Sequence, residues 1–137
     1  MKVFFDTSTL AKKYIDEAGT VELLDLLNKV SRISVSSVYI IEIFCFINRK
    51  IRENSINIKD LKFINEKILD DYNLFEMVIL SNEIQQKAVS LVNQYPLASL
   101  DSIQLASAIL AQPDIFVTSD KQLLKYAKHE LKNVKLI

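Results

Sequence analysis

Glycine is nearly absent from this sequence. Its 137 residues include a single glycine, Gly19. Gly-rich phosphate loops need several glycines close together, because the backbone must turn tightly and approach the phosphate. The dinucleotide-binding fingerprint and the P-loop are therefore excluded, and with them the usual nucleotide-cofactor enzymes.

Cysteine and histidine are almost as rare. The chain has one cysteine, Cys45, and one histidine, His129. It can form no internal disulfide, and two such residues cannot build a zinc site from Cys and His alone. With one His near the C-terminus, we expect no Ser–His or Cys–His nucleophile pair. Cys45 lies in the apolar run IEIFCFI and is predicted to be a small core residue.

An excess of one charge is also missing, since 17 Lys and Arg balance 17 Asp and Glu. This balance argues against a protein that holds nucleic acid by phosphate neutralisation alone, but not against an enzyme that uses a metal and a few local cations. No apolar run approaches the roughly 20 residues that span a bilayer. Asp6 interrupts the first apolar run too early for a signal peptide. We expect a cytoplasmic protein with no membrane contact.

Short β-branched apolar runs alternate with helical patterns along the chain. Half of the residues are hydrophobic, enough for a core, and the length fits one domain, residues 1–137. Strands are predicted at residues 2–5, 32–35, 74–80, 115–118 and 134–137. Helices are predicted from residue 7 towards the turn at Gly19 and at 21–30, 38–52, 58–70, 83–93, 99–111 and 121–128. This alternation predicts the α/β class, a three-layer α/β/α domain with a mostly parallel sheet of about five strands.

Local signals refine these elements. In the helix at residues 21–30, Val21, Leu24 and Leu27 are predicted to face inward, with Leu23 as a further candidate. Ser36 and Ser37 are N-cap candidates for the next helix, Ser81 for the helix at 83–93, and Thr118 or Ser119 for the helix at 121–128.

Four acidic residues occupy suggestive positions. Asp6 follows the first strand directly, and Asp120 follows the strand at residues 115–118 by two positions. Ligands of open α/β sheets bind beyond the carboxyl ends of the strands, so these two acids are expected at such a crevice. Glu42 lies inside the apolar helix VYIIEIFCFI, and Asp101 lies in the first turn of SLDSIQLASAIL.

Each acid has a purely structural interpretation as well. Asp6 and Asp120 are ordinary N-cap or helix-start residues, and Asp101 favours the helix dipole. Glu42 could belong to an exposed stripe of the helix, with Arg49 seven residues further along the same side. However, an ionised carboxylate among apolar neighbours costs several kcal/mol unless it is paired or metal-bound.

Taken together, the four acids favour a metal site. Hard ions such as Mg²⁺ or Mn²⁺ prefer all-oxygen ligands, and a cation relieves the mutual repulsion of carboxylates. Such an ion activates water and stabilises charge in phosphodiester hydrolysis.

Four segments carry a family resemblance. VFFDTSTLAKKYIDEAGT resembles the opening of VapC-like PIN-domain toxins, and SVSSVYIIEIFCFI resembles the turn and helix that carry the family's Glu. LASLDSIQLASAIL and IFVTSDKQLLKYAK resemble the segments of the third and fourth acids. The order and spacing cover nearly the whole chain.

The resemblance implies roles for particular residues. Asp6, Glu42 and Asp101 would form the central metal site, with Asp120 as the fourth acid. Thr118 matches a polar supporting residue, and Ser8 matches a residue whose hydroxyl contacts metal-bound water. Many relatives place Arg or Lys three residues before the third acid, where this chain has Ala98, so one phosphate contact is in doubt.

The sequence therefore predicts a Mg²⁺- or Mn²⁺-dependent endoribonuclease, the toxin of a toxin–antitoxin pair. The expected partners are RNA, a cognate antitoxin and a second copy of the chain in a homodimer. Candidate RNA-steering cations are Lys12, Lys13, Arg49, Lys50 and Arg52, although each also fits an ordinary surface charge. Two alternatives remain, a PIN-like nuclease of RNA maturation or DNA, and a Mg²⁺-binding signalling module. A signalling receiver would need an acidic neighbour for Asp6, which is absent.

Overall fold

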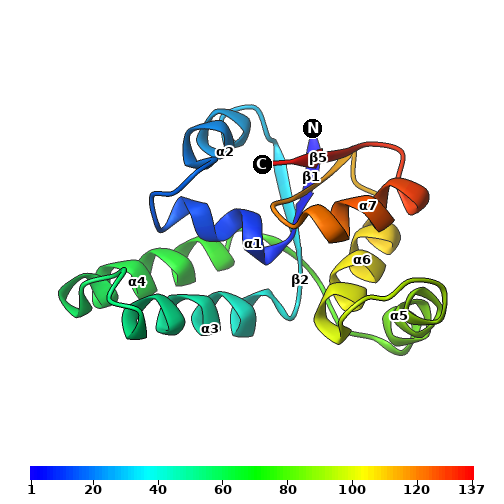
Figure 1. The fold of residues 1–137 in the computed structure, drawn as a ribbon. Helices are drawn as coiled ribbons and strands as arrows, with labels where there is room; N and C mark the ends of the chain where they lie inside the picture. The colour runs from blue at the N-terminus through cyan, green and yellow to red at the C-terminus, as the bar shows by residue number, and fades with distance from the viewer.

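A computed structural model describes residues 1–137 and contains a five-stranded sheet (Figure 1). The strands are β1 (Lys2–Phe5), β2 (Arg32–Ser36), β3 (Glu76–Val78), β4 (Ile115–Thr118) and β5 (Val134–Leu136). They lie in the order β3-β2-β1-β4-β5, and every neighbouring pair is parallel. The predicted α/β class with a parallel sheet of five strands is confirmed.

Helices connect all of these strands. They are α1 (Thr7–Leu10), α2 (Thr20–Leu27), α3 (Tyr39–Arg52), α4 (Leu61–Tyr72), α5 (Asn82–Gln94), α6 (Ser99–Ala111) and α7 (Lys121–Glu130). Two 3₁₀ helices, η1 (Ala11–Lys13) and η2 (Ile58–Asp60), extend α1 and precede α4. The expected helix before Gly19 is thus a short α-helix that tightens into a 3₁₀ turn.

The two faces of the sheet have separate cores because side chains alternate along a strand. Val3 and Phe5 of β1 belong to a core that includes Ile43 of α3. Phe4, between them, belongs to a second core with Leu105 of α6. Helices α1 to α4 therefore cover one face and α5 to α7 the other, as Figure 1 shows. This is the predicted three-layer arrangement.

The strand order places a topological switch point between β1 and β4. From β1 the chain crosses to β2 on one side of it, whereas β4 and β5 lie on the other side. The backbone N–H of Asp6 donates to the carbonyl of Val117 at 3.1 Å, which extends the β1–β4 pairing. The carboxyl ends of these two strands therefore lie side by side, where open α/β sheets bind ligands.

The inward face of α2 agrees with the prediction only at Leu23 and Leu27. Leu23 is fully buried, whereas Val21 and Leu24 are 72% and 43% exposed. Leu26 and Leu27 pack partly against the core. The segment VELLDLL contains two overlapping apolar stripes, and the one through residues 23, 26 and 27 packs on the sheet.

Cys45 is exposed, so its predicted place in the core is wrong. Helix α3 buries Tyr39, Ile43 and Ile47, which recur every four residues. Cys45 follows Ile43 by two positions and therefore points to the other side of the helix. The apolar run is longer than the stripe that the core can cover.

The helix caps agree only in part with the sequence signals. Ser81 caps α5 as predicted, accepting from the N–H of Ile84. Val38 is the N-cap of α3 and makes no side-chain cap bond, while Ser37 instead accepts from the backbone of Leu80. The cap of α7 is Asp120 rather than Thr118 or Ser119.

Strand β3 lies at the edge of the sheet and is shorter than the predicted strand at residues 74–80. Leu74 and Ile79 are 80% and 66% exposed, and only Glu76–Val78 pair with β2.

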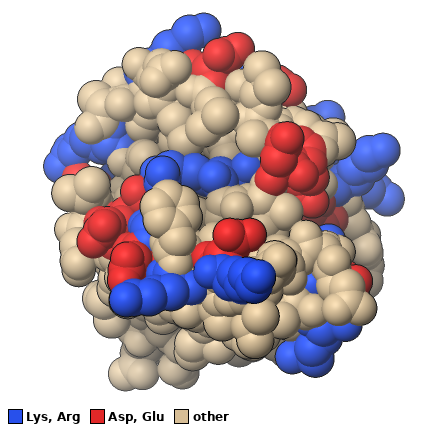
Figure 2. Space-filling model, turned by 90° about the vertical axis from the view of Figure 1, so that its left-hand side faces the viewer, with Lys and Arg blue, Asp and Glu red and all other residues tan.

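Figure 2 shows basic and acidic side chains interspersed over the face that it presents, in keeping with the balanced charge. None of the helices has the length and apolarity that crossing a membrane requires.

Candidate active site

Asp6 is the most buried of the predicted acids, with 4% of its surface exposed. Its Oδ1 accepts from the Ser8 hydroxyl at 2.6 Å and from the N–H of Thr9 at 3.1 Å. Its Oδ2 accepts from the Thr118 hydroxyl at 2.5 Å. Burial raises the pKa of Asp6 above its ordinary value, and these hydrogen bonds act against that rise. Asp6 therefore caps α1 and also presents a preoriented carboxylate.

Ser8 and Thr118 both donate hydrogen bonds to Asp6. The Ser8 hydroxyl also accepts from the N–H of Ser119 at 3.2 Å, which joins the segment after β1 to the segment after β4. The Thr118 hydroxyl accepts from the N–H of Asp120 at 3.0 Å. Both hydroxyls therefore tie the first acid to the loop that carries the fourth.

Glu42 reaches the same region from α3. Its Oε1 accepts from the Gln104 side-chain amide at 2.6 Å and from the Thr7 hydroxyl at 3.2 Å. Burial raises the pKa of Glu42, and the charges of Asp6 and Asp101 raise it further, against the two hydrogen bonds. Glu42 is thus held by hydrogen bonds beside other acids, which contradicts a merely exposed stripe.

Asp101 and Asp120 complete the cluster. Burial raises the pKa of Asp101, and the charges of Asp120 and Asp6 add to the rise. Asp120 accepts from the N–H groups of Gln122 and Leu123 and so begins α7. Each of the four acids is therefore electrostatically coupled to at least one of the others.

Two residues of this region, Gln104 and Thr7, were not predicted from the sequence. Gln104 is buried on α6, and its amide Nε2 donates to both Glu42 and the Thr7 hydroxyl, the latter at 2.9 Å. Its Oε1 is buried without a partner. Gln104 lies three positions after Asp101, so both share one helix face. The one signal in the sequence was the pair of larger polar residues, Asp101 and Gln104, on a helix whose other side chains are small or apolar.

In this structure, no three His, Cys, Asp or Glu side chains lie close enough together to hold a metal ion. The donor set itself fits a hard divalent cation, because it consists of carboxylate oxygens whose charges disfavour one another.

The predicted RNA-steering cations are not equivalent. Lys13 is ion-paired with Asp71 at 2.6 Å, and the Lys12 ammonium donates to the carbonyl of Ala18. Both are therefore engaged within the fold. Arg49 and Lys50 form only long contacts with Glu53, at 4.0 and 3.9 Å, and Arg52 makes no ion pair.

Ala98 stands at the N-cap of α6 and offers no side-chain hydrogen bond. The chain has no Lys or Arg between Lys87 and Lys121. The segment around Asp101 therefore contributes no cation of its own to this region.

Fold and site together define an α/β/α protein with four acidic residues beside its topological switch point. The PIN-domain family model matches residues 3–129. The chain belongs to the PIN-domain family, whose members are nucleases, and the resemblance found in the sequence is confirmed.

Solved structures agree with this fold. One is described as a toxin–antitoxin complex from Klebsiella pneumoniae, with TM-score 0.67, 20% identity and 88% of each chain covered. Another is described as VapBC2 from Rickettsia felis bound to a DNA fragment from their promoter. It has TM-score 0.70 and 16% identity, and the match covers 100% of this chain and 99% of that one. No curated protein matches the sequence.

Proposed function

We propose that this PIN-domain protein is a Mg²⁺- or Mn²⁺-dependent endoribonuclease and the toxin of a toxin–antitoxin pair. The observation that supports the proposal is that the charges of Asp6 and Asp101 raise the pKa of Glu42, and those of Asp120 and Asp6 raise that of Asp101. Four acids from four separate segments are thus electrostatically coupled. Carboxylates this close repel one another, and a bound cation would relieve that repulsion.

In this proposal Asp6, Glu42 and Asp101 hold a divalent cation, and Asp120 assists. When bound, such an ion supplies positive charge to the scissile phosphate and lowers the pKa of a water molecule. Ser8 and Thr118 keep Asp6 oriented, and Gln104 and Thr7 keep Oε1 of Glu42 engaged, which leaves its second oxygen free. The protein thus contributes preorganised carboxylates rather than a side-chain nucleophile.

Incubation of the purified protein with mixed RNAs tests the proposal. We expect cleavage with Mn²⁺ or Mg²⁺ and none with EDTA. Single-stranded and structured RNA and DNA of matched sequence form the other arms of the experiment. Cleavage restricted to DNA would favour the alternative nuclease role, and no cleavage of either with any divalent metal would contradict the proposal.

An antitoxin is the proposed protein partner. One similar structure is described as a toxin–antitoxin complex and another as VapBC2 bound to promoter DNA, which supports this choice. The four carboxylates suit an inserted Arg or Lys, which would pair with them in place of a metal. Co-expression with the neighbouring gene should yield a tight complex without nuclease activity. If that gene product neither binds nor inhibits, the toxin assignment fails and RNA maturation becomes the better assignment.

We also propose a homodimer. Val21 and Leu24 of α2 are exposed apolar side chains, as expected of a helix whose apolar surface exceeds what the sheet covers. Light scattering at tens of micromolar tests this proposal, and a monomer at that concentration would contradict it.

A further inference from the structure

A hollow of about 430 Å³ lies beside Glu42, and its volume is within the range of small-molecule pockets. Apolar side chains of Ile41, Phe46 and Leu100 line it, together with the cations of Arg49 and Arg52. The hydroxyl residues after Asp6 also reach it, so it is continuous with the acidic site.

The apolar lining is attached directly to the acids. Ile41 precedes Glu42 on α3 and is 67% exposed, while Leu100 precedes Asp101 on α6 and is 45% exposed. Ile41 and Leu100 both line the hollow together with Glu42. A ligand in the hollow that reaches the Glu42 carboxylate therefore also meets an apolar surface.

The cations of the hollow are available for pairing. The Arg49 guanidinium lies over the Phe46 ring, 5.4 Å from its centroid. Its contact with Glu53 is 4.0 Å, and 57% of its side-chain surface is exposed. Arg52 is exposed and has no acidic partner. Because the segment around Asp101 has no Lys or Arg, α3 supplies the positive charge on this side of the site.

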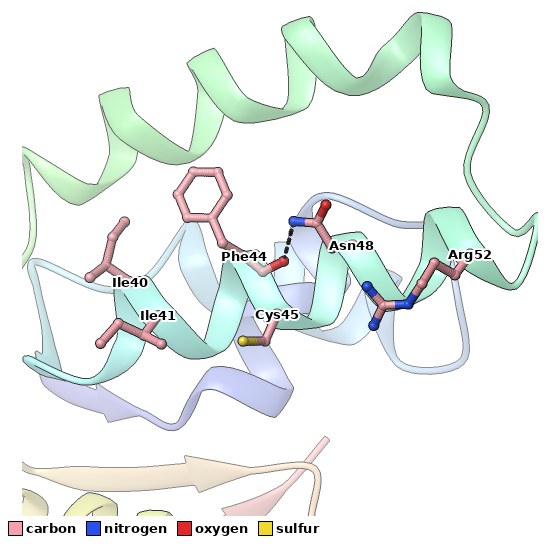
Figure 3. Close-up of a pocket in the computed structure, with 6 residues that line it drawn as sticks. All are labelled: Ile40, Ile41, Phe44, Cys45, Asn48 and Arg52. Atoms are coloured by element: carbon pink, nitrogen blue, oxygen red, sulfur yellow. Dashed lines mark hydrogen bonds between the residues drawn. The ribbon is translucent and has the colours of Figure 1, made fainter.

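A second hollow, of about 480 Å³, shares Ile41, Cys45 and Arg52 with the first (Figure 3). Figure 3 shows Phe44 and Asn48 on the side of α3 that faces α4. No carboxylate lines this second hollow, and Arg52 is its one cation. The hollow beside Glu42 is therefore the one that combines an apolar surface, two cations and the acidic site.

We infer that the hollow beside Glu42 is a subsite for one nucleotide of single-stranded RNA. The base lies against Ile41, Phe46 and Leu100, and its phosphate pairs with Arg49 and Arg52. Unpaired bases bind proteins by stacking on aromatic side chains and guanidinium planes, and Arg is the preferred phosphate partner. The inference rests on the proposed function, because the neighbouring phosphate is the one to be cleaved.

Binding of a short, unstructured, fluorescein-labelled RNA to protein that carries Asp6→Asn tests the subsite. In that background, Phe46→Leu keeps most of the apolar volume but removes the ring. Loss of one stacked base should weaken binding by about 5- to 150-fold. Phe63 of α4 also lies beside a cation, Lys67, but is 66% exposed and outside the hollow. The control Phe63→Leu should leave binding unchanged.

One further variant and one modified RNA separate phosphate recognition from base recognition. Arg52→Gln should weaken RNA binding and reduce the salt dependence of log Kd by about one unit. RNA with abasic positions should bind the protein with Phe46 intact about as weakly as normal RNA binds Phe46→Leu. If Phe46→Leu weakens the binding of normal RNA and of abasic RNA by the same factor, the ring acts on the fold rather than on a base. That result would overturn the assignment.

Cys45 provides an independent readout, since it is the sole cysteine, is exposed and lines the hollow. Saturating RNA should slow its modification by N-ethylmaleimide at least several-fold. An unchanged rate, with unchanged binding by Phe46→Leu and Arg52→Gln, would overturn the subsite even if the wild-type protein cleaves RNA. Protection by an antitoxin protein but not by RNA would assign the hollow to a protein partner and also overturn it. If RNA protects Cys45 but is never cleaved, the subsite stands and the proposed function fails.

Discussion

The side-chain amide of Gln104 donates a 2.6 Å hydrogen bond to Oε1 of Glu42, joining α6 to α3 across the acidic site. The same amide donates to the Thr7 hydroxyl, which itself donates to Glu42. Gln104 therefore fixes one oxygen of Glu42 and favours its ionised form, while the charges of Asp6 and Asp101 disfavour it. This makes Gln104 a positioning residue for the proposed metal site.

Replacing Gln104 by Leu should lower RNA cleavage by about 10- to 100-fold, the usual effect of losing a hydrogen-bond partner of a metal ligand. The hydrogen bond from Gln104 lowers the pKa of Glu42, so its removal should raise that pKa. The acid limb of the pH–rate profile should therefore move to higher pH. Ser107→Ala is a matched control, since it removes a buried hydrogen bond from α6 to Ser36 without touching Glu42. A pH–rate profile that is unshifted in Gln104→Leu, or equally shifted in the control, would argue for a merely structural role.

Glu42→Gln should not lower the stability of the metal-free protein and should raise it if repulsion dominates. The amide still accepts from Gln104 and Thr7 through its oxygen, whereas the charge opposed by Asp6 and Asp101 is gone. Mg²⁺ should then raise the melting temperature of the wild type more than that of the variant, by the linkage between binding and folding. Equal Mg²⁺ shifts in the two thermal melts would remove Glu42 from the metal site.

The stability of the metal-free protein should depend on pH through the same acids. Burial raises the pKa of Asp6, Glu42 and Asp101 above their ordinary values of 3.8, 4.5 and 3.8. The folded protein thus binds these protons more tightly than the unfolded chain. The resulting stabilisation is complete below about pH 4 and is lost as pH rises through the folded pKa values.

Thermal melts in EDTA from pH 4.5 to 8 measure this loss. The melting temperature should fall more steeply with pH in the wild type than in Asp6→Asn, which removes one of the raised groups. Asp25→Asn, at an exposed position on α2, should follow the wild type. Parallel curves for all three proteins would contradict the assignment.

Asp120 has a structural role that a pair of variants separates from its charge. It accepts from two N–H groups at the start of α7, at 2.7 and 3.0 Å. Asp120→Asn keeps the cap and should keep stability, whereas Asp120→Ala should lose about 0.5–2 kcal/mol of unfolding free energy. Both should cleave RNA more slowly. Full activity in Asp120→Asn would leave Asp120 as a cap alone.

The parallel sheet and the positions of the acids along the chain could be predicted from the sequence. β1 and β4 are mostly buried, so they appear as apolar runs, and Asp6 follows β1 directly while Asp120 follows β4 by two positions. Parallel strands bring their carboxyl ends to one edge, which made the meeting of these two acids predictable.

The exposed faces of helices were harder to predict. In VELLDLL and in IEIFCFI nearly every position is apolar, so periodicity cannot decide which stripe packs inward. Leu23 is buried instead of Val21, and Cys45 is exposed. Tertiary packing makes that choice, and it depends on how the sheet and neighbouring helices meet.

Gln104 could not be assigned from the sequence because its partner is distant along the chain. The hydrogen bond to Glu42 spans 62 positions. A glutamine on a helix is ordinarily a solvated residue, and only the approach of Gln104 and Glu42 beyond the edge of the sheet gives it a partly buried carboxylate to bind.

RNA cleavage by wild-type protein and Asp6→Asn, measured over a range of Mn²⁺ concentrations, tests the central claim most directly. Asn keeps the cap of α1, so the variant should fold, yet it lacks the most buried carboxylate of the site. We predict Mn²⁺-dependent cleavage by the wild type and by Asp25→Asn, and a loss of more than about 100-fold in Asp6→Asn, since even a supporting residue costs about 10- to 100-fold. Wild-type rates in a folded Asp6→Asn protein, at low and at high Mn²⁺, would contradict the account.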